Sequence, residues 1–299
     1  MRNEKLRGHL AILFTNVIFG FNAPLAKIAL GPEGLSAPVL SLLRIVLAAI
    51  LFWGLSCLVP RERVSRRDLL LIFFASLFAV TLNQPVFLIG LGITSPFNAS
   101  MLSNTMPILT MLMAALFLRE PMTWKKIVGV LLGVVGAGML LMAGPRGVQP
   151  VSLGDGLILL SLFSYVIYLT LFKNVATRYS PVTLMKWVFL FSSLCCLPVF
   201  APKVWAFDYS QVTPKGAFCA GYVALFATFL SYLLIPIAQH RLRPTVISMY
   251  GYTQPIIAGG LSLYLGMESF TGVKLVAVAL IFSGVYLVSV SKGRVPSEG

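Results

Sequence analysis

Residues 104–120 read NTMPILTMLMAALFLRE, and residues 252–268 read YTQPIIAGGLSLYLGME. Both stretches are apolar, carry a proline at their fourth position and end in a glutamate. A proline inside a helix removes one backbone hydrogen bond and disfavours the helix around it. The recurrence of such an unfavourable residue in register predicts that the chain contains two copies of one structural unit.

The two stretches belong to a longer internal repeat. A shift of 148 residues aligns residues 96–136 with residues 244–284 without a gap. The identical pairs include polar residues, prolines and glycines, which a shared apolar composition does not explain: Pro96/Pro244, Ser100/Ser248, Thr105/Thr253, Pro107/Pro255, Glu120/Glu268, Thr123/Thr271, Lys126/Lys274 and Gly136/Gly284. We therefore predict two repeats, residues 1–144 and residues 145–299.

The composition predicts that both repeats lie in a membrane. Of 299 residues, 58% are hydrophobic and 11% are charged, and the mean hydropathy is +0.90. Soluble domains carry about 25% charged residues, and about 20 apolar residues cross a hydrocarbon core as a helix. We predict an all-α integral membrane protein with ten transmembrane helices, at residues 9–28, 37–59, 68–91, 97–118, 124–142, 153–172, 182–201, 215–238, 245–266 and 272–291.

The basic residues indicate how these helices are oriented. The chain has 23 Lys and Arg residues against 9 Asp and Glu. With a cytoplasmic N-terminus, the outer side holds only a few of the basic residues: Lys27, Arg146, Lys203, Lys215 and Lys274. This asymmetry follows the positive-inside rule, and it predicts that both termini are cytoplasmic. Because topology explains the basic excess, we expect no nucleic-acid partner.

Five spans in each repeat require the second repeat to enter the membrane in the opposite orientation. The connection after the fourth span reads REPMTWKK at residues 119–126, and its counterpart at residues 267–274 reads MESFTGVK. The second copy lacks two of the basic residues, on the side where positive charge is disfavoured. We therefore expect the inverted-topology repeats that are typical of secondary transporters.

The chain resembles the drug/metabolite transporter superfamily, specifically its ten-span EamA-type exporters. The resemblance covers nearly the whole chain and rests on GFNAPLAKIAL at residues 20–30 and on the two long repeated runs at residues 95–141 and 243–287. Known relatives move amino acids, drugs, nucleosides and other small metabolites. The resemblance implies transport, usually efflux, across the inner (plasma) membrane. We expect a monomer or weak homodimer in the lipid bilayer.

Polar side chains at mid-membrane depth are the candidates for a substrate site. Pro107 and Pro255 lie near the bilayer midplane and are expected to break their helices, leaving the carbonyls of Ser103 and Gly251 without helical partners. Each break either lines a cavity or is a kink required by packing. The candidate substrate-binding residues are amides and phenols near these breaks or in other spans: Asn22, Asn83, Gln84, Asn104, Tyr165, Tyr168, Tyr232, Tyr252 and Gln254. For each of them, a hydrogen bond between helices is the alternative.

Two cations, Arg44 and Lys186, lie within predicted spans. Either could attract a substrate carboxylate, but long basic side chains by default extend their charged ends to the membrane interface. We therefore expect Asn104 and Gln254 to contribute more to binding than Arg44. In the fifth span, four glycines are expected to allow close helix approach: Gly129, Gly133, Gly136 and Gly138.

The acidic residues and histidines all lie at span ends, in connections or in tails. This placement favours a facilitator or exchanger over a proton antiporter that uses a mid-membrane carboxylate. The sequence contains neither HExxH nor GxxxxGK[ST], and we expect no enzymatic activity, cofactor or metal. The predicted function is secondary transport of a small metabolite by alternating access. The best single prediction for the substrate is an amino acid or a related solute. The alternative is a lipid or polyprenyl-carrier flippase on the same scaffold.

Overall fold

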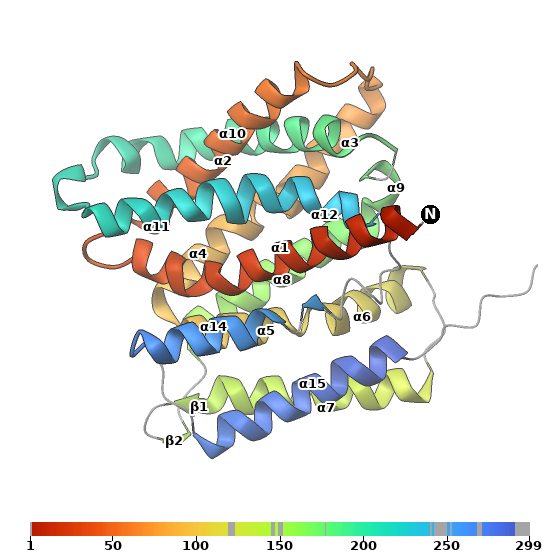
Figure 1. Ribbon diagram of the computed structural model, residues 1–299, viewed down its shortest axis with the longest axis vertical. Coiled ribbons are helices and arrows are strands. Elements are labelled where there is room, and N and C mark those ends of the chain that lie inside the picture. Colours follow the sequence, from red (N-terminus) through yellow and green to blue (C-terminus); the bar gives the residue numbers. More distant parts are fainter. Residues whose placement is uncertain are drawn as a thin grey trace, which may run out of the picture.

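The computed structural model describes residues 2–118, 123–144, 147–148, 152–176, 178–239, 241, 250–251, 253–267 and 271–290. Most of these residues form helices that run roughly side by side (Figure 1). The α-helices are α1 (Arg2–Ala29), α2 (Ala37–Ser56), α3 (Arg66–Ser76), α4 (Asn83–Ile93), α5 (Pro96–Ser103), α6 (Met106–Leu118), α7 (Trp124–Met142), α8 (Leu153–Leu171), α9 (Lys173–Ala176), α10 (Pro181–Trp205), α11 (Pro214–Ala224), α12 (Ser231–Gln239), α14 (Thr253–Tyr264) and α15 (Gly272–Val290).

Several helical segments are long and apolar enough to cross a membrane. In the described part of the chain there are six, with one shorter apolar helix at Gly272–Gly284: Leu6–Ala29, Ala37–Ser56, Arg66–Ile93, Leu153–Leu171, Pro181–Trp205 and Pro214–Ile235. The prediction of a helical, multi-pass membrane protein is confirmed. A short hairpin, β1 (Ala143–Gly144) with β2 (Gly147–Val148), was not expected, and it lies where the predicted repeats meet.

Serine and threonine residues begin many of these helices. Their hydroxyl oxygens accept hydrogen bonds from backbone N–H groups of the first turn, which otherwise lack partners. The capping residues are Ser65, Ser95, Ser152, Ser180 and Thr213. Proline follows directly in three cases, at the first helical position, where its fixed φ suits the helix. These residues therefore mark in the sequence where the helices begin.

Two of the predicted spans contain a π-helical segment. α3 continues through η1 (Leu77–Thr81) toward α4, and α11 continues through η3 (Leu225–Leu230) into α12. The two segments start 148 residues apart, which is the shift of the sequence repeat. A π-helical turn widens the helix and redirects the side chains that follow, and such turns are frequent at functional sites.

The helix that contains Pro107 is interrupted. α5 ends at Ser103 and α6 begins at Met106, so that Asn104 and Thr105 form a turn between them. In the second repeat, α14 begins two residues before Pro255. The Gly251 carbonyl lacks its helical partner, as expected, because residue 255 is a proline without an N–H group. It accepts a hydrogen bond from the Gln254 N–H at 3.1 Å, because a tighter turn replaces the bond that proline removes.

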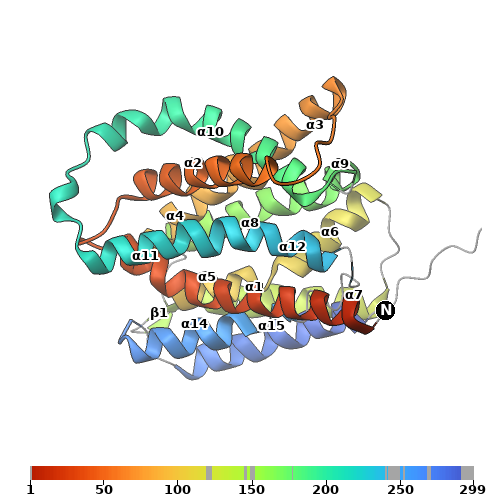
Figure 2. The same cartoon turned by 45° about the horizontal axis from the view of Figure 1, so that its top comes forward.

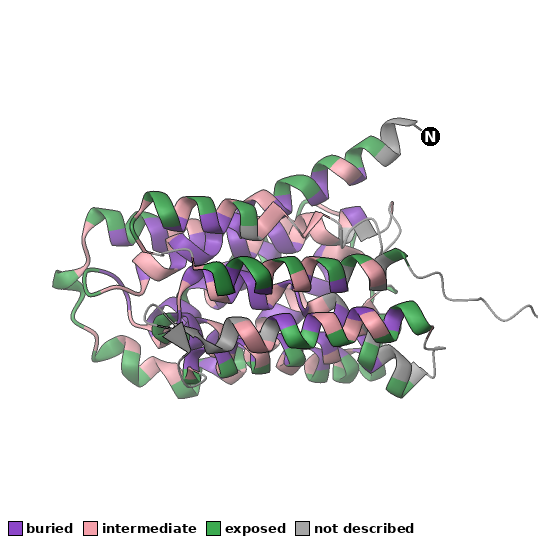
Figure 3. Ribbon diagram, turned by 90° about the horizontal axis from the view of Figure 1, so that it is seen from below, coloured by how far each residue is buried: buried purple, intermediate pink, exposed green. Residues whose placement is uncertain are grey.

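The interior packs around two large apolar clusters. One includes Phe52 of α2 and Phe189 of α10, whose rings stack at 5.5 Å. The other includes Leu88 of α4, Phe97 of α5 and Ile158 of α8. Figure 2 shows α2 and α10 side by side, and Figure 3 shows exposed surface along the outer faces of the helices. Many large apolar side chains lie on that exposed surface, as expected where lipid replaces water.

α7 and α15 approach each other through small residues. A Cβ atom added to Gly136 would lie 2.8 Å from the carbonyl oxygen of Ala277, and one added to Gly284 would lie 2.5 Å from that of Gly129. An added Cβ at Gly133 would overlap the side chain of Ile108. The prediction of close helix approach is confirmed at these glycines. It is wrong for Gly138, because no described atom lies within 4 Å of a Cβ added there.

Candidate functional site

Three of the predicted tyrosines form one cluster in the interior. The ring centroids of Tyr165 and Tyr168, both on α8, are 5.6 Å apart. Tyr232 of α12 packs edge-on against Phe189 of α10, at 5.3 Å between centroids. Tyr168 and Tyr232 are buried, and Tyr165 packs against the same apolar cluster. Helices from distant parts of the sequence therefore bring these phenols together.

Gln84 of α4 lies against this tyrosine cluster. Its side chain is 2% exposed, and the Tyr232 hydroxyl lies close to its amide. Neither Oε1 nor Nε2 of Gln84 makes a hydrogen bond of regular geometry within the described chain. A buried polar group without a partner costs about 1–3 kcal/mol. Gln84 therefore presents an acceptor and a donor in the interior.

Arg44 of α2 lies in the same region, contrary to the expectation that it extends to the membrane interface. Its side chain is 5% exposed, and its Nε donates to Thr228 Oγ1 at 2.7 Å. Thr228 lies in η3 and donates in turn to the Val223 carbonyl at 2.9 Å. The expectation that Arg44 extends to the interface is wrong because η3 places a hydrogen-bond acceptor, Thr228, next to α2. This contact holds the guanidinium in the interior. No described carboxylate pairs with Arg44.

Lys186 of α10 occupies a different environment from Arg44. Its Nζ lies 5.2 Å from the ring centroid of Trp53, near the end of α2. It is partly exposed, and an ammonium group over an indole face is stabilised by the negative face of the ring. Arg44 and Lys186 both lie within predicted spans, but in the structure Arg44 is buried and Lys186 is partly exposed.

Several of the other predicted residues have hydrogen-bond partners. Asn83 Nδ2 donates to the Ser161 carbonyl of α8 at 2.8 Å. Asn83 therefore makes a hydrogen bond between helices, which was the alternative to a role in substrate binding. Gln254 Nε2 donates to Asn16 Oδ1 of α1 at 2.6 Å, which joins α14 to α1. Asn104 Nδ2 donates to a carbonyl of its own helix at 3.0 Å. The amides of Asn83 and Gln254 therefore join neighbouring helices, whereas that of Asn104 closes a turn of α5.

Asn22 of α1 is buried, and its Oδ1 has no hydrogen-bond partner among the described residues. Tyr252 lies outside the described residues, and only the backbone is described for Pro107 and Pro255. The structure therefore unites Gln84 with Tyr165, Tyr168 and Tyr232, and it gives Asn83, Asn104 and Gln254 other partners. The sequence indicated Arg44 as a cation within a span but did not distinguish it from Lys186.

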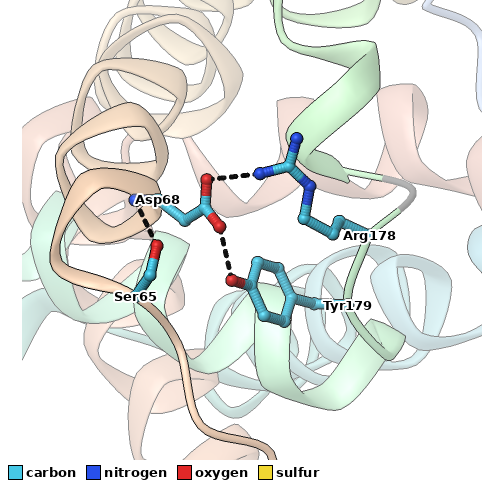
Figure 4. Close-up of polar contacts among 4 residues, drawn as sticks. All are labelled: Ser65, Asp68, Arg178 and Tyr179. Carbon is cyan, nitrogen blue, oxygen red and sulfur yellow. Dashed lines mark hydrogen bonds and ion pairs between the residues drawn. The ribbon is translucent and has the colours of Figure 1, made fainter.

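Polar contacts also join helices at both ends of the bundle. At the end where α3 begins, Asp68 accepts from Arg178 Nη1 at 2.7 Å and from Tyr179 Oη at 2.6 Å (Figure 4). At the other end, Lys27 Nζ donates to three carbonyls at the C-terminus of α4, each at 2.8 Å. Nearby, the Thr94 hydroxyl donates to the carboxylate of Asp155.

Glu62 strengthens the connection between α2 and α10 at the Asp68 end. Its carboxylate accepts hydrogen bonds from Ser180 N at 3.0 Å and from Ser180 Oγ at 2.8 Å. Desolvation opposes ionisation here, but hydrogen bonds from Thr183 and Ser180 outweigh it and hold the pKa of Glu62 below its ordinary value. The hydrogen bond to Asp68 raises the pKa of Tyr179. At neutral pH this end of the bundle therefore carries an ionised Glu62 and a neutral Tyr179.

A groove of about 480 Å³ lies between α1 and α12. Its walls are apolar, and two arginines lie where α1 begins and α12 ends. The lining residues are Arg7, Leu10, Ala11, Phe14, Leu234, Ile237 and Arg241. The described residues contain no group of three or more His, Cys, Asp or Glu side chains that could hold a metal ion.

The helical bundle and its exposed apolar surface define a multi-pass membrane protein. The EamA-like transporter family matches the chain twice, over residues 6–142 and residues 152–290. The chain therefore belongs to the EamA-like transporter family, and the resemblance inferred from the sequence is confirmed. Family membership indicates a membrane transporter of small solutes rather than an enzyme.

Relatives of this chain occur in bacteria, plants and archaea. The uncharacterized transporter YetK of Bacillus subtilis is 26% identical over 77% of this chain and 70% of its own length. A WAT1-related protein of Arabidopsis thaliana is 21% identical over 98% of this chain and 87% of its own length. A solved crystal structure shares the fold, with a TM-score of 0.65 and 17% identity, over 96% of this chain and 98% of the other.

Proposed function

We propose that this protein is a secondary transporter that moves a small metabolite across the inner membrane by alternating access. The proposed substrate is an amino acid or a related solute, and the proposed direction is efflux. The observation that carries this proposal is the internal cluster of Gln84, Tyr165, Tyr168 and Tyr232. Aromatic walls with a few polar groups that still have hydrogen-bonding capacity suit a small amphipathic solute.

The proposed architecture is ten transmembrane helices in two inverted repeats, residues 1–144 and residues 145–299, with both termini in the cytoplasm. Reciprocal contacts between α7 and α15 support it. Gly136 approaches Ala277, and Gly284 approaches Gly129. The shift of 148 residues converts each contact into the other, as expected when a two-fold rotation relates two antiparallel helices. The matched positions of η1 and η3 support the same relation.

The candidate site is formed by both repeats, which is what alternating access requires. Gln84 comes from the first repeat, and the tyrosines come from the second. A relative movement of the repeats would expose the cluster to one side of the membrane and then to the other. The turn at Asn104 and Thr105 and the two π-helical segments are the proposed positions of bending.

The cluster contains no Asp, Glu or His among its described residues. We therefore keep facilitated diffusion or exchange as the proposed mode of transport, without proton exchange at a buried carboxylate. A flippase remains the second candidate because of the groove between α1 and α12. Its apolar walls suit acyl or polyprenyl chains, and Arg7 and Arg241 suit an anionic head group.

Flux in proteoliposomes tests the proposal. Vesicles that contain the purified protein are expected to release at least one member of a radiolabelled pool of amino acids, nucleosides and organic acids. Gln84→Leu should abolish that flux, because it removes the amide at nearly constant size, whereas Gln211→Leu in an exposed connection should not. Folded protein that moves no solute but scrambles fluorescent phospholipid would overturn the proposal in favour of a flippase.

A further inference from the structure

We propose that Arg44 is the anchor for a carboxylate, so that the solute taken by this site is a small amphipathic monocarboxylate. This inference rests on the proposed function and gives its substrate a chemical class. Arg44 belongs to α2, which packs against α4, α10 and η3. Its guanidinium lies close enough to the Tyr232 hydroxyl to interact with it electrostatically. Arg44 is therefore part of the same cluster as Gln84 and the tyrosines.

The charge of Arg44 is not neutralised within the described chain. Its one hydrogen bond goes to the uncharged hydroxyl of Thr228. Burial of an isolated charge is strongly unfavourable, and buried charges in proteins are normally paired. Arg44 stays charged at all ordinary pH values because arginine is not deprotonated in proteins. A group that brings a negative charge to Arg44 would therefore gain a strong, poorly screened interaction.

The geometry of the guanidinium favours a carboxylate. Thr228 holds Nε, which fixes the plane of the group and leaves both Nη atoms without hydrogen bonds from the described residues. Two parallel N–H donors match the two oxygens of a carboxylate. Arg44 supplies a single positive charge, which matches a carboxylate better than a dianionic phosphate.

The neighbours of Arg44 define the rest of the solute. Gln84 offers an unused acceptor and donor, which suit an amino or hydroxyl group. Tyr165, Tyr168 and Phe189 supply aromatic surface for an apolar or aromatic substituent. An anionic end, one hydrogen-bonding group and an apolar body together describe a small amphipathic monocarboxylate.

Thermal stabilisation of the purified protein by matched carboxylates and amides tests this inference. The probes are phenylacetate against phenylacetamide and phenylalanine against phenylalaninamide. A ligand that binds only the folded state raises the apparent Tm, and the stabilisation grows with the logarithm of its concentration relative to its Kd. We expect stabilisation by at least one carboxylate and none by its amide. Arg44→Gln should weaken the carboxylate affinity by about 10- to 100-fold. Arg44→Lys should keep part of the affinity, because it retains the charge but not the paired donors.

Two further variants separate recognition from folding. Thr228→Val keeps the charge but releases Nε, so it should weaken carboxylate binding by less than Arg44→Gln does. Lys186→Gln removes the cation that lies over Trp53 and should leave the affinity unchanged. Unchanged carboxylate stabilisation in Arg44→Gln, equal stabilisation by the amides, or equal stabilisation by sodium chloride at the same concentration would overturn the inference.

The outcome is distinguishable from failure of the transporter proposal. Flux of neutral amides without carboxylate binding would overturn the role of Arg44 and leave the transporter intact. Carboxylate binding that depends on Arg44, without flux of any solute in proteoliposomes, would support the anchor and overturn the transporter.

Discussion

Buried polar side chains in this bundle have no bulk water to satisfy them, so each one either finds a partner in the chain or remains available to a solute. Asn83 and Gln254 find partners on neighbouring helices. Gln84 and Asn22 keep atoms without partners in the described chain. This difference separates residues that hold the helices together from those that can bind a solute, although all four are amides within predicted spans.

The Asn16–Gln254 hydrogen bond gives a prediction for stability. Gln254→Ala leaves Asn16 Oδ1 without its donor at the contact between α1 and α14. We expect a loss of about 1 kcal/mol, because hydrogen bonds between membrane helices contribute about 0.6 kcal/mol on average and about 1.7 kcal/mol at most. Unfolding of the purified protein by titration with SDS measures the change. Ser283→Ala, on an exposed face of α15, is the control, and equal midpoints for the two variants would contradict the prediction.

Glu62 gives a prediction for pH dependence. Its pKa is lower in the folded protein than its ordinary value, so its carboxylate stabilises the fold at pH values above the unfolded pKa. That contribution is lost as the pH falls through the folded pKa. The apparent Tm of Glu62→Gln should therefore lie below that of the wild type at about pH 7, and the difference should close toward about pH 3. A Tm difference that is independent of pH would refute this assignment.

α7 and α15 come close to each other at positions that lack side chains. α7 and α15 meet at Gly129, Gly136 and Gly284, where the backbone of one helix contacts the other. Small residues allow membrane helices to approach closely and gain van der Waals contact, because lipid supplies no hydrophobic driving force between them. The pair α7–α15 is therefore sensitive to one added methyl group.

Gly284→Ala should destabilise the protein, whereas Gly138→Ala should not. The new methyl group at residue 284 would lie 2.5 Å from the Gly129 carbonyl oxygen, so the helices must separate. Overpacking of this kind costs about 1–3 kcal/mol. At residue 138 no described atom lies within 4 Å, and alanine favours the helix over glycine. The two variants are compared by their apparent Tm values in the same detergent. An equal change in Tm for both would contradict the close contact between Gly284 and Gly129.

In the molecule as a whole, the topology decides which surfaces face each side of the membrane. Lys125 and Val273 occupy equivalent positions in the two repeats and are both exposed, near the starts of α7 and α15. An inverted repeat places them on opposite sides of the membrane, whereas a parallel repeat would place them on the same side.

Labelling with a membrane-impermeant maleimide tests this topology in intact cells. In a variant without the native cysteines, Val273→Cys should react in intact cells. Lys125→Cys should react only after the membrane is permeabilised. Reaction of both cysteines before permeabilisation would refute the inverted arrangement. Labelling after denaturation serves as the control for equal expression.

The sequence by itself determined that the protein is helical and lies in a membrane, because span length and hydropathy reflect the thickness of a bilayer and need no tertiary information. The interrupted helix at Pro107 was expected for the same local reason, since proline removes a bond from its own helix. The family also followed from the sequence, through repeated motifs that extend over most of the chain.

Only the tertiary structure decided which polar residues meet. Arg44 and Lys186 look alike in the sequence, yet one is buried against Thr228 and the other lies over Trp53. The contacting residues of each pair lie on helices that are far apart in the sequence. The π-helical segment that contains Thr228 cannot be recognised from the hydropathy of the sequence. Local chemistry thus determines each helix, whereas the buried charge and its neighbours depend on how the helices pack.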